Sequence, residues 1–156
     1  MTRPPRSSEP SASWPLFLTA HAGLLRALGA RLKQAELPPL EWYDVLWALE
    51  RAPDGRLRMS ALAEQLLLTR FNATRLVDRL ADAGLVAREK TREDGRGAYA
   101  VLTASGRDLR RRMWPVYRAG INDLFEQHLG SRDHAALQRM LRAVIDGNRE
   151  ADPGES

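Results

Sequence analysis

The residues most able to recognise another molecule lie between 70 and 80, where apolar residues recur at the spacing of a helix. One side of this helix is apolar and must face the core: Ala73, Leu76, Val77 and Leu80. The opposite side holds Phe71, Thr74, Arg75 and Asp78, with Arg70 and Asn72 in the flanking first turn. Because arginine pairs with guanine and asparagine with adenine, this side has the chemistry to read bases in a major groove. The alternative is a surface helix whose polar side is only solvated.

Phe71 favours base reading, because an aromatic ring opposite the apolar stripe needs a partner. In a DNA complex that partner would be a thymine methyl group or a sugar. The other interpretation is that the ring folds under a neighbouring loop of the same chain.

A second basic feature is the turn at 91–97, between two segments whose residues suit strands. The turn carries Arg92 and Arg96, and the glycines on both sides of Arg96 permit a tight bend. Asp94 precedes Arg96 by two residues and can hold its guanidinium by an ion pair. A basic hairpin can reach a minor groove, where narrow tracts attract arginine. The alternative is a plain solvated turn.

Periodicity and capping residues predict the elements that must position these side chains. The first half of the chain is expected to hold a helix over 14–36, a helix with Pro39 as its first residue and an extended piece at 56–59. A helix capped by Ser60 and a helix capped by Thr69 that ends at Gly84 should follow. After them we expect strands at 85–90 and 98–102, a helix capped by Thr103 that runs to Leu129, and a last helix after Gly130 and Ser131. Two short helices with a tight link and a following hairpin form the order of a winged helix-turn-helix. We therefore expect an α+β, mostly helical fold.

Several short motifs appear in a fixed order: Leu62-Ala63 with Leu66, Thr74-Arg75-Leu76-Val77-Asp78-Arg79-Leu80, Gly84-Leu85-Val86, Arg88, Asp94-x-Arg96 and Leu102-Thr103-x-x-Gly106. Over residues 40–109 this set resembles the MarR (multiple antibiotic resistance regulator) family of winged helix-turn-helix transcriptional regulators. The resemblance implies a homodimer, with Arg96 in the minor groove, Asp94 supporting it, and the helix from Arg70 in the major groove. The residues expected to contact DNA are Ser60, Arg70, Phe71, Asn72, Thr74, Arg75, Arg92, Asp94 and Arg96. The sequence departs from the family at Gly95 and Gly97, where larger or charged residues are common.

The resemblance also implies that the first and the last two helices form the dimer interface. We expect a winged module over 39–103 between dimerisation regions at 14–38 and 104–150, with a flexible arm at 1–13 and a flexible tail at 151–156. The terminal helices carry more apolar residues than a monomer needs, and those expected at the interface are Trp14, Phe17, Leu129, Leu137, Leu141 and Ile145. A two-fold dimer separates its reading helices by about 34 Å, so the operator should be a near-palindrome.

Net positive charge is concentrated in the middle of the chain. From Arg51 to Arg112 there are 14 Lys and Arg against 8 Asp and Glu, a net +6, although the whole 156-residue chain carries only +4. A nucleic-acid face produces such an asymmetry, and a solvated basic surface is the alternative.

Other chemistry finds little support in the residue types. The absence of cysteine excludes disulfides, thiolate metal sites and thiol sensing. The histidines, His21, His128 and His134, have no metal-ligand spacing, and no catalytic constellation appears. We therefore expect no metal, no cofactor and no enzyme activity.

The apolar segment from Leu16 to Ala30 resembles a targeting signal only superficially. His21 and Arg26 interrupt it, and it is too short to span a membrane. We expect an amphipathic helix, no membrane partner and a cytoplasmic protein.

Four tryptophans and three tyrosines lie mostly in the first, second and fifth expected helices. In relatives, the cleft between these helices and the DNA module binds small aromatic or phenolic anions. The residues expected to line such a cleft here are His21, Trp42, Tyr43, Trp114 and Arg118. The alternative is that these rings only pack in the core and the dimer interface.

These patterns predict a sequence-specific regulator that binds duplex DNA as a homodimer, represses from a palindromic operator and is released by a small aromatic or phenolic effector. A bound effector would act by changing the spacing of the two reading helices. Two alternatives stay open: a DNA binder with no small-molecule input, and a winged-helix protein-interaction module that binds no DNA.

Overall fold

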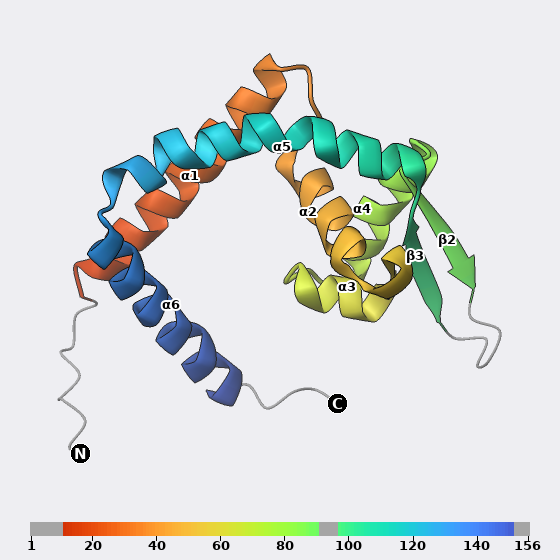
Figure 1. The fold of residues 1–156 in the computed structure, drawn as a ribbon. Coiled ribbons are helices and arrows are strands. Elements are labelled where there is room, and N and C mark those ends of the chain that lie inside the picture. Colours follow the sequence, from red (N-terminus) through yellow and green to blue (C-terminus); the bar gives the residue numbers. More distant parts are fainter. Residues whose placement is uncertain (1–10, 91–96, 152–156) are drawn as a thin grey trace.

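The computed structural model describes residues 11–90 and 97–151, which form an arch (Figure 1). Helices α1 (Ser13–Gln34) and α5 (Ala104–Leu124) lie side by side along its top, and α6 (Ser131–Ala151) descends at one end. The other end holds α2 (Leu40–Arg51), α3 (Met59–Gln65), α4 (Arg70–Asp82) and a small sheet. The predicted α+β, mostly helical winged helix-turn-helix fold is confirmed.

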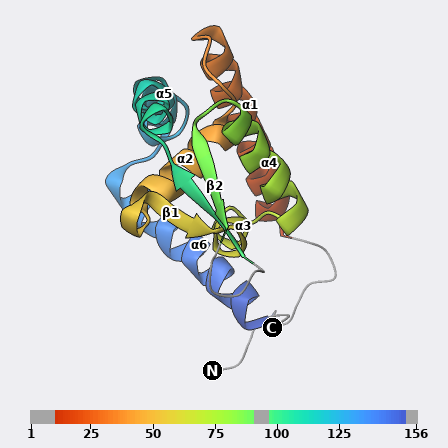
Figure 2. The same ribbon diagram turned by 90° about the vertical axis from the view of Figure 1, so that its right-hand side faces the viewer.

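The sheet has three antiparallel strands, β1 (Arg56–Arg58), β2 (Val86–Lys90) and β3 (Ala98–Leu102), in the order β1-β3-β2 (Figure 2). Tyr99 in the central strand pairs with Arg58 on one side and with Glu89 on the other. The extended piece expected near residue 56 is therefore a strand of the same sheet as the hairpin. Short 3-10 turns precede β1 (η1, Pro53–Gly55) and follow α5 (η2, Glu126–His128).

One apolar core holds this end of the arch together. Its fully buried residues come from α1, α2, α3, α4, α5 and β3, and the largest are Leu32, Leu46, Leu49, Leu62, Leu80 and Met113. The predicted inward stripe of α4 is confirmed, since Ala73, Leu76, Val77 and Leu80 are all buried. Burial of this apolar stripe orients α4, because the polar side of the helix must then face away from the core.

Two predicted helix caps are confirmed. The backbone amide of Asn72 donates to the Thr69 hydroxyl at 3.2 Å, and that of Gly106 donates to the Thr103 hydroxyl at 3.1 Å. Each hydroxyl satisfies an amide that has no partner within its helix, which explains why α4 and α5 begin where they do. Gly84 follows the end of α4 with a φ of +73°, a conformation that glycine adopts without strain.

Other predicted boundaries are wrong by small amounts. The α3 helix begins at Met59, so Ser60 lies in its first turn and does not cap it. Pro39 is the residue before α2 and not its first residue, and α1 ends at Gln34. The fifth helix ends at Leu124 and not at Leu129, because Phe125 leaves helical geometry with a φ of −132°.

The far end of the arch is less well covered. The large apolar residues exposed there include Trp14, Leu16 and Phe17 in α1, and Met140, Val144 and Ile145 in α6. Within the described residues, no helix combines the length and apolarity needed to cross a bilayer.

Candidate nucleic-acid interface

The outward side of α4 is open to solvent. Arg70, Phe71, Asn72 and Arg75 are exposed, and Phe71 keeps 67% of its surface accessible. The ring of Phe71 therefore does not fold under a neighbouring loop of the described chain. The guanidinium carbon of Arg75 lies 5.5 Å from the ring centroid, so these side chains stack one helical turn apart.

Other polar side chains of α4 are engaged within the chain. The Thr74 hydroxyl donates to the Arg70 carbonyl at 2.8 Å. Asp78 accepts from Arg88 of β2 at 2.5 Å, and Arg79 donates to Glu41 of α2 at 2.9 Å. These two ion pairs tie α4 to the sheet and to α2, and they neutralise the carboxylate on the predicted base-reading side.

A basic hollow of about 410 Å³ lies between the start of α3, the first turns of α4 and the base of the hairpin. Arginines from three elements line it: Arg58 from β1, Arg70 from α4 and Arg88 from β2. Ser60 and Thr74 add hydroxyl groups, and no acidic side chain is among the described lining residues. The guanidinium groups and the Ser60 hydroxyl are donors that suit a phosphate oxygen.

The outer side of the sheet continues this basic surface. The Arg56 guanidinium lies 4.2 Å from the centroid of Tyr99, and Arg58 donates to the Tyr99 hydroxyl at 3.2 Å. Arg56 also pairs with Glu89 at 3.3 Å. Sequence reasoning missed Arg58 and Arg88, because only strand pairing brings them next to α4; their arginine type in a basic segment was the available signal.

The structure brings together five of the nine residues expected to contact DNA. Ser60, Arg70 and Thr74 line the basic hollow, and Phe71 and Arg75 stack on the same side of α4. Asn72 is exposed beside them. Arg92, Asp94 and Arg96 at the hairpin tip lie outside the described residues.

An aromatic cluster lies where α2 meets α5. Tyr43 stacks on Trp47 and Trp114 with centroids 6.4 and 6.2 Å apart, and it meets the edge of Tyr117 at 4.9 Å. The guanidinium groups of Arg110 and Arg51 lie 5.3 and 5.5 Å from the Trp47 ring. Burial raises the pKa of the Tyr43 phenol above its usual value, so that group stays protonated at neutral pH.

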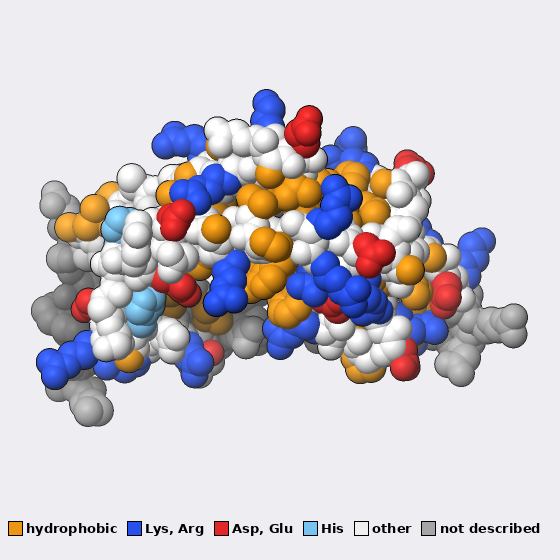
Figure 3. All heavy atoms as spheres, turned by 45° about the horizontal axis from the view of Figure 1, so that its top comes forward, with side chains coloured by type: hydrophobic (Ala, Val, Ile, Leu, Met, Phe, Trp, Pro, Cys, Tyr) orange, Lys and Arg blue, Asp and Glu red, His pale blue; other side chains and the backbone are white. Residues whose placement is uncertain are grey.

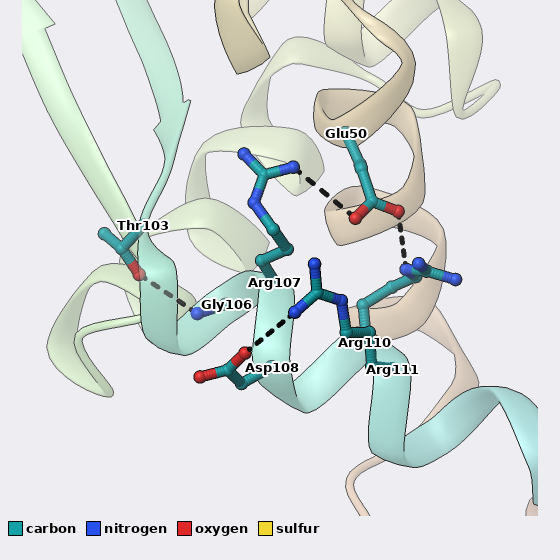
Figure 4. A network of polar contacts seen from close by, with 7 residues as sticks. All are labelled: Glu50, Thr103, Gly106, Arg107, Asp108, Arg110 and Arg111. Atoms are coloured by element: carbon teal, nitrogen blue, oxygen red, sulfur yellow. Dashed lines mark hydrogen bonds and ion pairs between the residues drawn. The ribbon is translucent and has the colours of Figure 1, made fainter.

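Glu50 ties α2 to α5 beside this cluster (Figure 4). Its carboxylate pairs with Arg110 at 2.6 Å and with Arg107 at 3.5 Å. The Glu50 and Arg110 side chains are each only 15% exposed, so this pair is screened less than the exposed Asp108–Arg111 pair. Since α5 starts directly after β3, the contact couples the winged end of the arch to its top.

The predicted effector residues are only partly brought together. Tyr43 and Trp114 are in contact, Trp42 packs half-buried against the core, and Arg118 is exposed. His21 stacks on Phe17 near the start of α1, which Figure 1 places at the other end of the arch from α2. Trp47, Tyr117 and Arg110 were missed, although the spacing of four residues in Tyr43/Trp47 and Arg110/Trp114 was a usable signal.

A larger hollow of about 630 Å³ opens beside Trp47. It is lined from α2 by Asp44, Trp47 and Arg51, and from β1 and the end of α3 by leucines. This volume lies within the range of small-molecule sites. In the described part of the chain, no group of three or more His, Asp or Glu residues is arranged to hold a metal ion.

The six residues expected at a dimer interface lie at the far end of the arch. Trp14, Phe17 and Ile145 are 55%, 48% and 50% exposed. Leu129, Leu137 and Leu141 are half-buried, and the first two line an apolar hollow between α1 and α6. On the face seen in Figure 3, hydrophobic side chains gather along the middle of the arch with basic side chains around them.

Comparisons with known proteins agree with this architecture. Residues 36–97 match the family model described as MarR family. No curated protein matches the chain. AbsC, a MarR family transcriptional regulator from Streptomyces coelicolor, is 28% identical with a TM-score of 0.83, and the match covers 96% of this chain and 99% of AbsC.

Two further solved structures were determined with a bound molecule. Sco3205, a MarR family transcriptional regulator from Streptomyces coelicolor in complex with DNA, is 29% identical with a TM-score of 0.84, covering 94% of this chain and 92% of Sco3205. NadR in complex with 4-hydroxyphenylacetate is 27% identical with a TM-score of 0.66, covering 91% and 97%. The family match over residues 36–97 and the likeness along nearly the whole chain together show that this protein has the winged helix fold of the MarR family transcriptional regulators.

Proposed function

We propose that this protein binds duplex DNA sequence-specifically and acts as a homodimeric repressor on a near-palindromic operator. The observation that carries the proposal is the basic hollow formed by Arg58, Arg70 and Arg88, which adjoins the exposed polar side of α4. The DNA complex of Sco3205, a relative of the same fold, supports it. In this role the protein would act in the cytoplasm and would not be an enzyme.

The geometry suits one helix in a major groove. With α4 in the groove, Phe71, Asn72 and Arg75 face base edges, while the arginines of the hollow face the phosphates of one strand. The winged module over 39–103 then reads DNA as one unit, and Arg96 at the hairpin tip reaches the adjacent minor groove, supported by Asp94.

A second copy of the chain is the proposed partner of the terminal helices at 14–38 and 104–150. Their exposed apolar residues are more than a monomer leaves to solvent, and a two-fold contact covers the same residues on both copies. Dimerisation places two copies of α4 on successive turns of one face of DNA, which explains the expected palindrome.

The proposed effector is a small aromatic or phenolic anion. The hollow beside Trp47 offers an aromatic ring for stacking and the Arg51 guanidinium for a carboxylate. The NadR complex with 4-hydroxyphenylacetate supports this class of ligand. A ligand there touches both α2 and the end of α3, and so can change the spacing of the two copies of α4.

The test of DNA binding is selection from a pool of random duplexes, followed by affinity measurements at two salt concentrations. We expect a palindromic site and a steep fall in affinity with salt. Arg70→Ala, at the exposed arginine that α4 contributes to the hollow, should reduce the salt slope by about one and weaken all sequences alike, as expected for loss of a phosphate contact. Arg139→Ala, an exposed arginine of α6, is the matched control and should change neither quantity.

A protein that binds no duplex even at low salt would overturn the proposal and favour the protein-interaction module. The effector is tested separately, by titrating 4-hydroxyphenylacetate into the protein–DNA complex. We expect release of the DNA by the wild type and loss of that response in Arg51→Ala. Release that is unchanged in Arg51→Ala places the effector elsewhere.

A further inference from the structure

The side chains of α4 that remain available to a base are few. Thr74 donates to its own helix, Asp78 is paired with Arg88, and Arg79 is paired with Glu41. Arg70 lines the basic hollow, whose character suits a phosphate. Asn72 is exposed in the flanking first turn, and the centre of the exposed side is therefore left to Phe71 and Arg75.

These two residues are held together. Arg75 lies with its guanidinium carbon 5.5 Å from the centre of the Phe71 ring, and the two residues are four apart on one helix. Stacking restricts the long arginine side chain before any DNA is bound, so less conformational freedom is lost on binding. Phe71 is 67% exposed, and its exposed ring surface is available to a partner.

We propose that Phe71 and Arg75 act as one specificity element that reads a guanine and a thymine on neighbouring base pairs of each half-site. This inference rests on the proposed function and deepens it. The planar guanidinium donates to O6 and N7 of guanine, and the ring contacts the 5-methyl group of thymine. Successive base pairs are about 3.4 Å apart along the helix axis, so groups separated by 5.5 Å reach neighbouring pairs.

The alternative role for Phe71 is to support Arg75 only, with no contact to DNA of its own. The two roles differ in their dependence on the thymine methyl group, which deoxyuridine lacks. They also differ from a phosphate contact, which would be indifferent to both bases.

The experiment uses the full-length protein and the operator recovered by selection from random duplexes. Each thymine of the half-site is replaced by deoxyuridine and each guanine by 7-deazaguanine, one at a time, and affinities are measured for the wild type, Phe71→Ala and Arg75→Lys. Leu67→Ala, which truncates a 93% exposed leucine just before the same helix, controls for loss of exposed apolar surface. Arg79→Lys controls for a change of arginine type on the same helix.

We expect one thymine whose replacement weakens wild-type binding about fourfold and one adjacent guanine whose replacement weakens it about tenfold. The deoxyuridine effect should vanish in Phe71→Ala and persist in Leu67→Ala. The 7-deazaguanine effect should shrink in Arg75→Lys, because a lysine lacks the fixed planar donor geometry of a guanidinium, and it should persist in Arg79→Lys.

Binding to an operator in which no adjacent thymine and guanine show these effects would overturn this inference and leave the proposed function standing. The same holds if both effects persist unchanged in Phe71→Ala and Arg75→Lys. A wild-type protein that binds no duplex would overturn the proposed function, and this inference with it. If a variant is poorly folded, binding of the wild-type protein to the base-substituted operators still tests the inference.

Discussion

The two ends of the arch contain the same kind of amphipathic helix, but its apolar side is buried at one end and exposed at the other. In the winged end, Val77 and Leu80 of α4 are completely buried by other elements of the chain. In α6, Val144 and Ile145 are 62% and 50% exposed. The winged end thus covers its apolar surface by itself, whereas the far end leaves part of its apolar surface exposed.

This difference fits a division of labour between the ends. A module that must enter a groove needs a rigid internal core, so that its polar side is presented in one geometry. Helices that pair with a second copy, as we propose for α1 and α6, instead keep apolar residues exposed in the single chain. Four predictions test this comparison, in order of decreasing effect.

The largest effect is expected in the core of the winged end. Leu80→Ala removes a completely buried side chain of α4 and should lower the free energy of unfolding by about 2–5 kcal/mol. Urea denaturation followed by circular dichroism measures this change. Leu67→Ala, at a 93% exposed leucine, should change it by less than about 0.5 kcal/mol. Equal effects of the two truncations would contradict the idea of a self-sufficient core.

A smaller loss is expected at the point where α5 leaves the sheet. Gly106 is buried, and a Cβ there would lie 2.1 Å from the backbone oxygen of Leu85, so the helix start must shift. Gly106→Ala should lower the free energy of unfolding by about 1–3 kcal/mol. Gly147→Ala in α6, where a Cβ would meet nothing within 4 Å, should instead raise it by up to about 1 kcal/mol. Thermal unfolding of both variants gives the comparison, and a loss in Gly147→Ala would count against it.

A substitution at the far end should change dimerisation and not the folding of the winged end. Ile145→Asp puts a charge on the exposed apolar side of α6 and should weaken the dimer at least about tenfold. Sedimentation velocity over a range of concentrations measures this change, with Asn148→Asp as the exposed control on the same helix. A dimer of unchanged affinity in Ile145→Asp would show that α6 does not cover its apolar side in this way.

The smallest effect concerns pH at the crossing of α1 and α5. The Arg31 guanidinium donates to Asp123 at 2.8 Å, which with a weaker contribution from Asn122 lowers the pKa of that carboxyl below its usual value. The stabilisation is therefore present above the unfolded-state pKa, near about 3.9, and is lost as the pH falls through the folded-state value.

Asp123→Asn should accordingly be slightly less stable than the wild type at pH 7, and the difference should shrink as the pH falls below the unfolded-state pKa. The midpoint of urea unfolding at several pH values measures the difference. Both side chains are partly exposed to solvent, at 35% and 46%, so the effect is small and should shrink further in high salt. A difference that grew at low pH would reverse the assigned direction of the pKa change.

Local sequence patterns predicted much of the winged end correctly. The inward residues of α4, the caps at Thr69 and Thr103, and the return strand at 98–102 all depend on residues within a few positions of each other. Where local reasoning failed, the competing signals were also local. Ser60 is a strong capping residue, but the strand that ends at Arg58 leads directly into α3, which begins at Met59, two residues before the start that a Ser60 cap predicts.

The candidate site shows the same limit more clearly. Phe71 and Arg75 are four residues apart on a helix, so their proximity follows from helical geometry alone. Arg88 meets Asp78, Arg79 meets Glu41, and Arg58 meets Tyr99 only because β2, α2 and β3 are packed beside α4 and β1. The periodicity of the sequence does not predict these pairs.

The sequence by itself determined which side of each helix is apolar, where α4 and α5 begin, and that the basic residues gather in the middle of the chain. Those properties follow from side-chain type and the fixed repeat of a helix or strand. The tertiary structure alone decided which arginines are engaged in ion pairs, which surround one hollow, and that α6 stays uncovered while α4 is buried. These outcomes depend on contacts between residues tens of positions apart, whose meeting is set by the packing of whole elements and not by their local order.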